Sequence, residues 1–335
     1  MPGPSRAEPF GTSYISGPKQ ATNMTHCTSL FHRCRVSGPF ILVLLAASSV
    51  NVRAQDFEPR QYANAPIGVN FIAAGPALTR LGFPLDPAVP LTDPDLNTYS
   101  AVLGYARVVR LGGQSAKLSV VAPYAWLDGT ARFNGEPVSR QVDGLTDVKV
   151  RLAANLLGAP ALGLKEFVDY RQDLVIGASL TVTCPTGQYD PDRLVNLGAN
   201  RWSFKGELGA SQAVGKWVLE LSATAEVFTD NPDFYIDRTR EQDAVYAGKG
   251  HVIRNFAKGM WASVDLTYYA GGSTTIDGVF RNDLQQNWRT GATFSAPLSK
   301  RHGLRFNWSS GVYARTGNNF DQLALTWQYR WGAGL

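Results

Sequence analysis

Few side chains in this sequence are suited to catalysis or to metal binding. After residue 54 the chain contains only two histidines, His251 and His302, and a single cysteine, Cys184. Ser263 could serve as a nucleophile beside His251, and with an orienting Asp or Asn such a pair would hydrolyse an ester. No nucleophile motif surrounds Ser263, so we expect no catalytic residue. Two histidines without a third clustered ligand predict no metal site, and no cofactor is expected.

Charged side chains, in contrast, recur at alternate positions within apolar stretches. If these stretches are strands, the charges share one face, and we predict that this face lines a wet lumen. The lumen-facing candidates are Lys149, Arg151, Lys205, Glu207, Glu220, Glu226, Lys249, His251, Asp265, Arg289, Arg305 and Arg330. Without the histidine, the set has seven basic and four acidic residues. This excess predicts a weak preference for anions such as carboxylated or phenolate aromatics, with neutral hydrophobic solutes as the competing class. If the charges pair with each other, the barrel could instead be plugged.

A local motif, PTGQYD at residues 185–190, is typical of a chain reversal. Pro185 cannot extend a strand ladder, Gly187 permits a positive φ, and Asp190 can cap a turn, with Thr186 and Tyr189 between them. Turn chemistry therefore favours a simple strand exit. The alternative is a loop that folds inward and constricts a channel.

The elements that carry these residues are predicted to be strands. In the C-terminal stretch QLALTWQYRWGAGL, Leu325 and Trp327 fall on one face, and Thr326 and Gln328 fall on the other. About twelve stretches follow such a pattern, which predicts one strand in each. They are PIGVNFIAA, TYSAVLGYARVV, AKLSVVAPYAW, DVKVRLAANLL, LVIGASLTV, RWSFKGELGAS, WVLELSATAEV, AVYAGKGHVIRNF, WASVDLTYY, WRTGATFSAPL, GLRFNWSSGVYAR and FDQLALTWQYRW.

Large aromatic side chains gather near the ends of these stretches, where a bilayer interface would hold them. We predict an aromatic girdle of Trp126, Trp202, Trp217, Trp261, Trp288, Trp327, Tyr329 and Trp331. Short turns alternate with long polar loops, except that residues 158–173 form a long connection where a short one is expected. We therefore predict an all-β fold, a transmembrane antiparallel β-barrel of about 12 strands with short periplasmic turns and long extracellular loops. A soluble sandwich or lipocalin-like barrel would instead bury its apolar face in a core.

Residues 1–54 have the features of an N-terminal extension and a signal peptide. A basic stretch precedes the apolar PFILVLLAASSV, and small residues precede Gln55. Because the stretch before Met24 is unlike a signal, we expect the signal to span residues 24–54 and a single barrel domain to span residues 55–335. Beyond residue 54 the chain has 27 basic and 26 acidic residues, a balance that argues against a nucleic-acid-binding surface.

Three stretches resemble a known family: GLTDVKVRLAANLL, PTGQYD and NLGANRWSFKGELGASQ. They are similar to the outer-membrane "transporter" proteins of the MetA-pathway phenol-degradation family, and the resemblance covers most of residues 66–331. It implies a porin-like barrel that passes aromatic or other hydrophobic compounds. The connection at residues 158–173 and the GAGL tail after Trp331 depart from the expected pattern.

These observations predict a channel or transporter for small solutes in the cell outer membrane, exported with a cleavable signal peptide. Its partners would be the lipid bilayer, the solutes and, during biogenesis, the barrel-assembly machinery; no nucleic acid is expected. Two alternatives remain. One is an outer-membrane barrel enzyme such as a lipid esterase, and the other is a structural or adhesive barrel that works through its outer loops.

Overall fold

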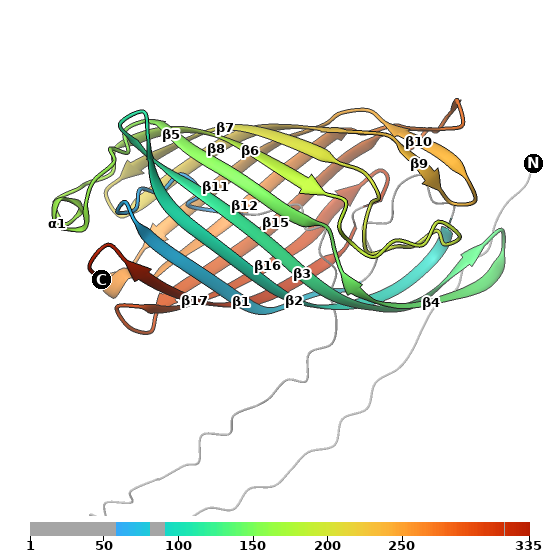
Figure 1. Cartoon of the computed structure of the whole chain (residues 1–335), viewed down its shortest axis with the longest axis horizontal. Helices are drawn as coiled ribbons and strands as arrows, with labels where there is room; N and C mark the ends of the chain where they lie inside the picture. Colours follow the sequence, from blue (N-terminus) through green and yellow to red (C-terminus); the bar gives the residue numbers. More distant parts are fainter. Residues whose placement is uncertain (1–57, 81–90, 318) are drawn as a thin grey trace, which may run out of the picture. The chain divides into compact units, whose positions relative to one another are not determined.

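A computed structural model describes residues 58–80, 91–317 and 319–335 (Figure 1). All of them belong to a compact unit that spans Ala46–Leu335. The expected signal peptide and the expected first mature residue, Gln55, lie outside the described residues, and they stay predictions.

Twelve of the strands form a closed antiparallel barrel. They are β1 (Val69–Arg80), β2 (Leu91–Leu111), β3 (Gln114–Phe133), β5 (Val148–Leu157), β6 (Leu174–Cys184), β7 (Ser203–Val214), β8 (Trp217–Phe228), β11 (Val245–Asn255), β12 (Trp261–Gly271), β15 (Gln285–Pro297), β16 (His302–Ala314) and β17 (Asp321–Gly332). Strand β1 pairs with both β2 and β17, which closes the ring. Closure pairs the strand edges, as a sheet inside a membrane requires. The predicted fold class is confirmed, and each of the twelve predicted stretches coincides with one strand.

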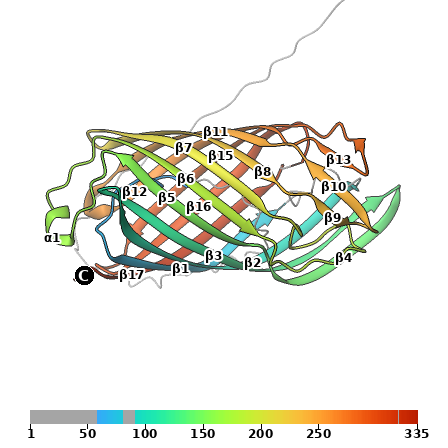
Figure 2. The same ribbon diagram turned by 45° about the horizontal axis from the view of Figure 1, so that its top comes forward.

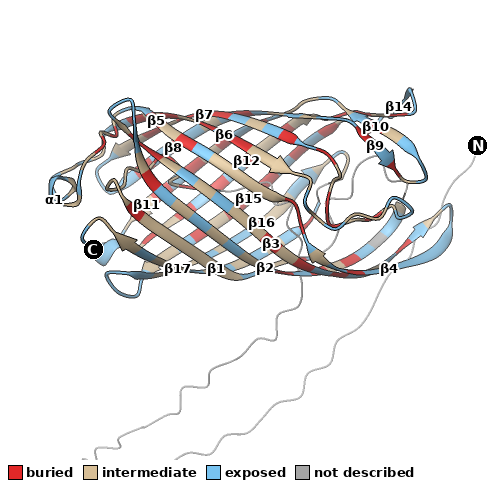
Figure 3. Cartoon of the chain, in the orientation of Figure 1, coloured by how far each residue is buried: buried red, intermediate tan, exposed pale blue. Residues whose placement is uncertain are grey.

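Burial alternates along the strands in the sense that a membrane barrel requires (Figure 3). On β8 the apolar side chains of Leu219 and Leu221 are 48% and 70% exposed. Val218 and Glu220, which alternate with them along the strand, are only 3% and 7% exposed. Large apolar side chains therefore point outward and polar ones inward. A soluble barrel would show the opposite arrangement, because its apolar face would form the core.

The two ends of the barrel differ. At one end, the short-turn end, β2 is joined to β3 and β7 to β8 by two residues each. The other end, the long-loop end, carries the long connections, and in an outer-membrane barrel this end faces outward. The helical segments α1 (Leu164–Phe167) and η1 (Ala257–Gly259) are single turns. Among the described residues no helix has the length and apolarity needed to cross a membrane.

The long-loop end contains structure where the sequence predicted only polar loops (Figure 2). Strand β3 continues beyond its membrane segment and pairs with β4 (Glu136–Leu145) in a hairpin. Asn134 and Gly135 form its turn with φ values of 51° and 87°, which suits a two-residue hairpin turn. Four shorter strands form a second sheet: β9 (Asn231–Phe234), β10 (Arg238–Gln242), β13 (Thr274–Ile276) and β14 (Val279–Phe280).

Candidate functional site

The predicted lumen residues fall on the inward parity of their strands, with different degrees of burial. Those buried are Glu207, Glu220, Lys249, His251, Asp265 and Arg289, and those partly buried are Lys149, Arg151, Lys205, Glu226 and Arg305. Arg330 differs, because its side chain is exposed at the short-turn end and donates to the carbonyl oxygen of Lys300 at 2.7 Å. The inward face therefore brings most of the predicted charges together.

Glu207 is the centre of one charged cluster. Its Oε2 atom accepts a hydrogen bond from Lys249 Nζ at 2.8 Å, and its Oε1 atom lies 3.9 Å from Arg151 Nη2. The hydroxyl group of Tyr62 donates to the same Oε1 atom at 3.1 Å. Only 6% of Glu207 is exposed, and a buried carboxylate is stable only when it is paired and hydrogen-bonded in this way.

Tyr62 belongs to a segment, residues 58–68, that precedes the first strand and enters the barrel. We call it the N-terminal segment. The Tyr62 ring lies against two glycines on the inward face: a Cβ atom at Gly177 would lie 2.6 Å from Tyr62 Cε1, and one at Gly209 would lie 2.5 Å from Tyr62 Cε2. Any larger side chain at these two positions would displace the ring. The two glycines thus form the seat for Tyr62.

Other residues of the N-terminal segment bind the same inner wall. The backbone N–H of Arg60 donates to Glu220 Oε2 at 2.7 Å, and its Nη2 atom donates to Asn255 Oδ1 at 3.0 Å. Gln61 donates to the hydroxyl oxygen of Ser179 at 3.2 Å. Glu58 accepts a charged hydrogen bond from Arg151. The N-terminal segment therefore lies inside the barrel along β5 to β11.

Trp261 was predicted to belong to the aromatic girdle, and this prediction is wrong. It is only 5% exposed and lies on the inner wall, where the guanidinium carbons of Arg60 and Arg305 are 5.3 and 5.5 Å from its ring centroid. The sequence contained the signal for this placement. Trp261 shares its parity with Asp265, which was predicted to face the lumen, so the two predictions were inconsistent.

The remaining girdle candidates have different environments. Trp126, Trp202, Trp217, Trp288 and Trp327 are between 38% and 45% exposed on the outward face, and Tyr329 and Trp331 are partly buried. At the short-turn end the rings of Trp327, Tyr329 and Trp331 stack in succession, with centroid distances of 6.3 and 5.7 Å. His302 joins this group and accepts a hydrogen bond from Trp327 Nε1 at 3.2 Å.

The long connection at residues 158–173 contacts the N-terminal segment. Asn64 donates to the carbonyl oxygen of Pro160 at 3.1 Å, and the backbone N–H of Ile67 donates to the carbonyl oxygen of Leu162 at 2.9 Å. Tyr62 and Ala159 belong to one small hydrophobic cluster. Tyr170 fixes the connection by donating to Gly158 O at 2.8 Å, and burial raises the pKa of its hydroxyl group. The unexpected length of this connection is explained by its role as a support for the N-terminal segment.

His251 does not form the nucleophile–base pair that an esterase needs. Its Nδ1 atom lies 2.7 Å from Asp265 Oδ1, and the Ser263 hydroxyl group donates to Asp265 Oδ2 at 3.2 Å. Among the described residues no hydrogen bond joins Ser263 to His251. The aspartate is thus the shared partner, whereas in a hydrolytic triad the histidine is the shared partner.

The side chain of Arg289 is buried and fixed by neighbouring residues. It is 1% exposed, its Nη1 and Nη2 atoms donate to Phe320 O and Ser309 Oγ at 3.0 Å each, and its guanidinium carbon lies 3.7 Å from the centroid of the Phe320 ring. A side chain held in this way anchors the start of β17 rather than presenting a mobile charge to a solute.

At the long-loop end the PTGQYD motif is held by Asp147, the residue before β5. Asp147 Oδ1 accepts from the backbone N–H of Gly187 at 2.9 Å, and Oδ2 accepts from that of Ala199 at 2.8 Å. Gly187 lies so close to Gly198 that a Cβ atom on Gly187 would be 2.6 Å from Gly198 Cα. We call this arrangement of Asp147, Gly187, Gly198 and Ala199 the loop clasp.

Beyond the loop clasp, residues 188–197 lie on the inner face of the barrel mouth. Val195 and Leu197 pack against Ala125 and Leu127, which are inward residues of β3. Tyr189 donates to the carbonyl oxygen of Asp233 at 3.0 Å and so connects the loop to the second sheet. Residues 185–187 leave β6 in a bend, without a positive φ at Gly187, and the rest of the loop packs against the inward residues of β3.

Sequence reasoning missed the N-terminal segment altogether. Residues 58–65 have no strand or helix periodicity, and their partners are far away along the chain. One signal was present: Gly177 and Gly209 stand on the inward parity of neighbouring strands, and glycine within a strand often marks a close approach by another part of the chain.

Comparisons with known proteins agree with this architecture. The family described as "Putative MetA-pathway of phenol degradation" matches residues 79–329, as the resemblance implied. The COG4313 outer membrane channel from Pseudomonas putida F1 superposes with a TM-score of 0.68 at 18% identity, over 82% of this chain and 100% of that one. The transport unit of the autotransporter AIDA-I from Escherichia coli superposes less well, with a TM-score of 0.45 at 8% identity over 83% of this chain and 93% of that one. Curated protein sequences gave no match. At 18% identity the likeness to the COG4313 channel concerns the fold alone.

Proposed function

Because the chain belongs to the family described as "Putative MetA-pathway of phenol degradation", we propose that it is an outer-membrane channel for small solutes, aromatic or hydrophobic compounds among them. Its fold is that of an outer-membrane barrel, so the lipid bilayer is one partner. Signal-dependent export and insertion by the barrel-assembly machinery belong to the same proposal.

The observation that carries the proposal is a polar inner wall that is partly covered by the chain itself. The N-terminal segment is fixed to this wall by Glu58, Arg60, Gln61 and Tyr62. A polar lumen suits water and solutes, and a segment inside it reduces the free cross-section. The expected cargo is therefore small. A catalytic role has less support, because Ser263 donates to Asp265.

The charges of the wall support a weak preference for anions. Each of the four predicted acids accepts a hydrogen bond: Glu207 from Lys249 Nζ, Glu220 from the backbone N–H of Arg60, Glu226 from Ser203 and Asp265 from Ser263. The seven basic lumen candidates outnumber these four acids, so the acids cannot neutralise all of the positive charge on the predicted inner wall. A positive potential in a narrow pore raises the local concentration of anions.

Single-channel recording in a planar bilayer tests both parts of the proposal. We expect a small conductance and, under a salt gradient, a reversal potential that indicates a mild anion preference. Arg305→Ala should reduce that preference because Arg305 lies on the inner wall. Arg254→Ala is the matched control, since Arg254 stacks on the outward Trp217 with its guanidinium carbon 4.7 Å from the ring centroid. Cation selectivity in the wild type would refute the anion preference. The absence of both ion current and benzoate permeation in liposomes would refute the channel.

A further inference from the structure

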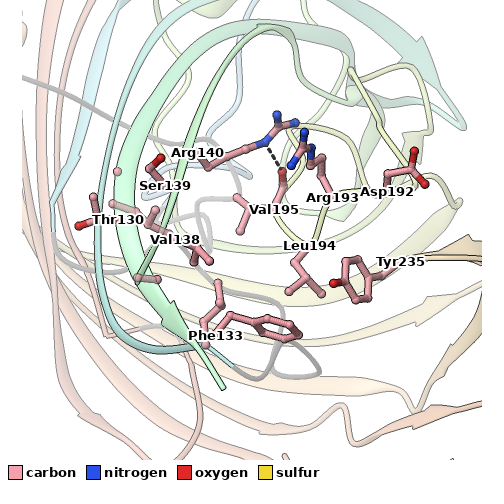
Figure 4. Close-up of a pocket in the computed structure, with 14 residues that line it drawn as sticks. Thr130, Phe133, Val138, Ser139, Arg140, Asp192, Arg193, Leu194, Val195 and Tyr235 are labelled. Atoms are coloured by element: carbon pink, nitrogen blue, oxygen red, sulfur yellow. Dashed lines mark hydrogen bonds between the residues drawn. The ribbon is translucent and has the colours of Figure 1, made fainter. Parts of the chain in front are cut away.

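A cavity of about 140 Å³ lies at the long-loop end, between the β3–β4 hairpin and the loop that follows the loop clasp (Figure 4). We call it the mouth cavity. Ala131, Val138 and Arg140 contribute from the inward side of the hairpin, and Arg193, Leu194 and Tyr235 face them. Leu91 and Leu96 of β2 line it as well, so four separate parts of the chain build one partly open cavity.

One side of the mouth cavity is basic. Arg140 Nε donates to the carbonyl oxygen of Val195 at 3.1 Å, which fixes the guanidinium group and leaves its Nη atoms as further donors. Figure 4 shows the guanidinium groups of Arg140 and Arg193 next to each other, with the Asp192 carboxylate turned away from them. Arg193 Nε lies 3.8 Å from Asp190 Oδ2, with its side chain 62% exposed. Within the described part of the chain, Arg140 forms no ion pair.

This arrangement favours an anion near Arg140. Burial lowers the pKa of Arg140, Asp190 raises it, and the neighbouring charge of Arg193 lowers it further. An arginine nevertheless stays charged in a protein, so two guanidinium groups of like charge are held close together. A carboxylate that accepts two N–H donors from such a group forms a short, directional contact.

The other side of the mouth cavity is apolar and aromatic. Phe133 and Tyr235 meet edge to face with ring centroids 6.1 Å apart, and the aliphatic side chains of Val138 and Leu194 belong to the same wall. Tyr235 is held at the cavity by a turn in which Tyr235, Ile236 and Asp237 all have positive φ values. An apolar cavity of about 150 Å³ accommodates one benzene ring, so the mouth cavity has the size for a single ring.

We propose that the mouth cavity binds a small aromatic carboxylate, with the ring between Phe133, Leu194 and Tyr235 and the carboxylate at Arg140. This inference rests on the proposed function and adds a capture site at the mouth of the channel. Aromatic packing supplies contact area, and the guanidinium group selects the charged end. A neutral analogue of the same size should bind more weakly, since it would leave Arg140 without an anionic partner.

Calorimetric titration of the barrel in lipid nanodiscs, with benzoate and benzyl alcohol as probes, tests this site. Wild-type protein should bind benzoate saturably and more tightly than benzyl alcohol. Arg140→Gln should weaken benzoate binding about tenfold or more and leave benzyl alcohol nearly unchanged. The matched control is Arg132→Gln on the same hairpin, where the side chain is exposed and lies 3.8 Å from Asp93, and this variant should bind benzoate as the wild type does.

A second variant separates cavity occupancy from charge. Ala131 is 7% exposed and lines the mouth cavity, so Ala131→Leu should fill it and weaken the binding of both probes. Thermal unfolding of each variant shows that the barrel is intact. The inference is overturned if wild type shows no saturable benzoate binding. It is also overturned if Arg140→Gln and Arg132→Gln behave alike, or if Ala131→Leu binds benzoate normally.

Current measurements on the same preparations distinguish this inference from the proposed function. A barrel that conducts ions but does not bind benzoate overturns the mouth site and leaves the channel in place. A barrel that binds benzoate with the predicted variant pattern, but carries neither ion current nor benzoate, overturns the channel and leaves the mouth site in place.

Discussion

A substitution in the seat of Tyr62, on the barrel wall, can displace the N-terminal segment while the sequence of that segment stays unchanged. In Gly177→Ala a new Cβ atom would lie 2.6 Å from Tyr62 Cε1, whereas unbonded carbon atoms pack about 3.5–4.0 Å apart. The ring must therefore move by about 1 Å or more. Gly209 lies against the other edge of the ring, where a Cβ atom would be 2.5 Å from Tyr62 Cε2, so movement toward β7 brings the ring closer to the backbone of that strand.

The N-terminal segment, rather than the wall, should absorb this movement. The backbone of β6 is paired along its length on both sides, with β5 and with β7, whereas the N-terminal segment is held by a few side-chain contacts and isolated backbone hydrogen bonds. Overpacking of this kind costs about 1–3 kcal/mol. Losing the hydrogen bond from Tyr62 to the charged Glu207 would cost a further ~1.5–3 kcal/mol. We expect Gly177→Ala to lower the free energy of unfolding by a few kcal/mol and to raise the single-channel conductance.

The assay is single-channel conductance in a planar bilayer, together with trypsin digestion in detergent. Release of the N-terminal segment should expose the bond after Arg60 to trypsin while the barrel stays resistant. Gly206→Ala is the matched control, because Gly206 stands on the next strand and a Cβ atom there has no neighbour within 4 Å. If Gly177→Ala matches Gly206→Ala in conductance and in cleavage, the segment is not held by this seat.

Two further predictions concern the orientation of β17 and the start of the mature chain. Leu325→Arg places a charge on the lipid face and should cost about 2–4 kcal/mol in a folding titration, whereas Gln328→Arg on the inward parity should cost little. Gln328 serves as the inward control because its partner on β16 is Gly303, so a new arginine there meets no like charge directly opposite. If Gln328→Arg cost more than Leu325→Arg, the orientation of β17 would be contradicted. The mature protein should begin at Gln55, and N-terminal sequencing of membrane-extracted protein tests this. A first residue before Met24, with the apolar stretch of the signal retained, would contradict it.

The barrel could be predicted from the sequence because its pattern is local. Each strand alternates between lipid and lumen with a period of two residues, so neighbours in sequence report the environment directly. The N-terminal segment and the mouth could not be predicted in this way. The hydrogen bond from Tyr62 to Glu207 joins residues 145 positions apart, and no local pattern encodes it. Trp261 shows the intermediate case, since its strand was predicted well and its face followed from the parity of Asp265.

The motifs that resemble the family meet at the mouth of the barrel. GLTD supplies Asp147, PTGQYD supplies Gly187, and NLGAN supplies Gly198 and Ala199, and the loop clasp joins all of them. These residue types follow from the contact itself, because only glycine allows two backbones to approach so closely and a carboxylate can accept both N–H groups. The strands, in contrast, need only alternating polarity, which many sequences satisfy. The three stretches thus contribute residues to one contact at the mouth, and the loop that follows this contact forms one wall of the mouth cavity.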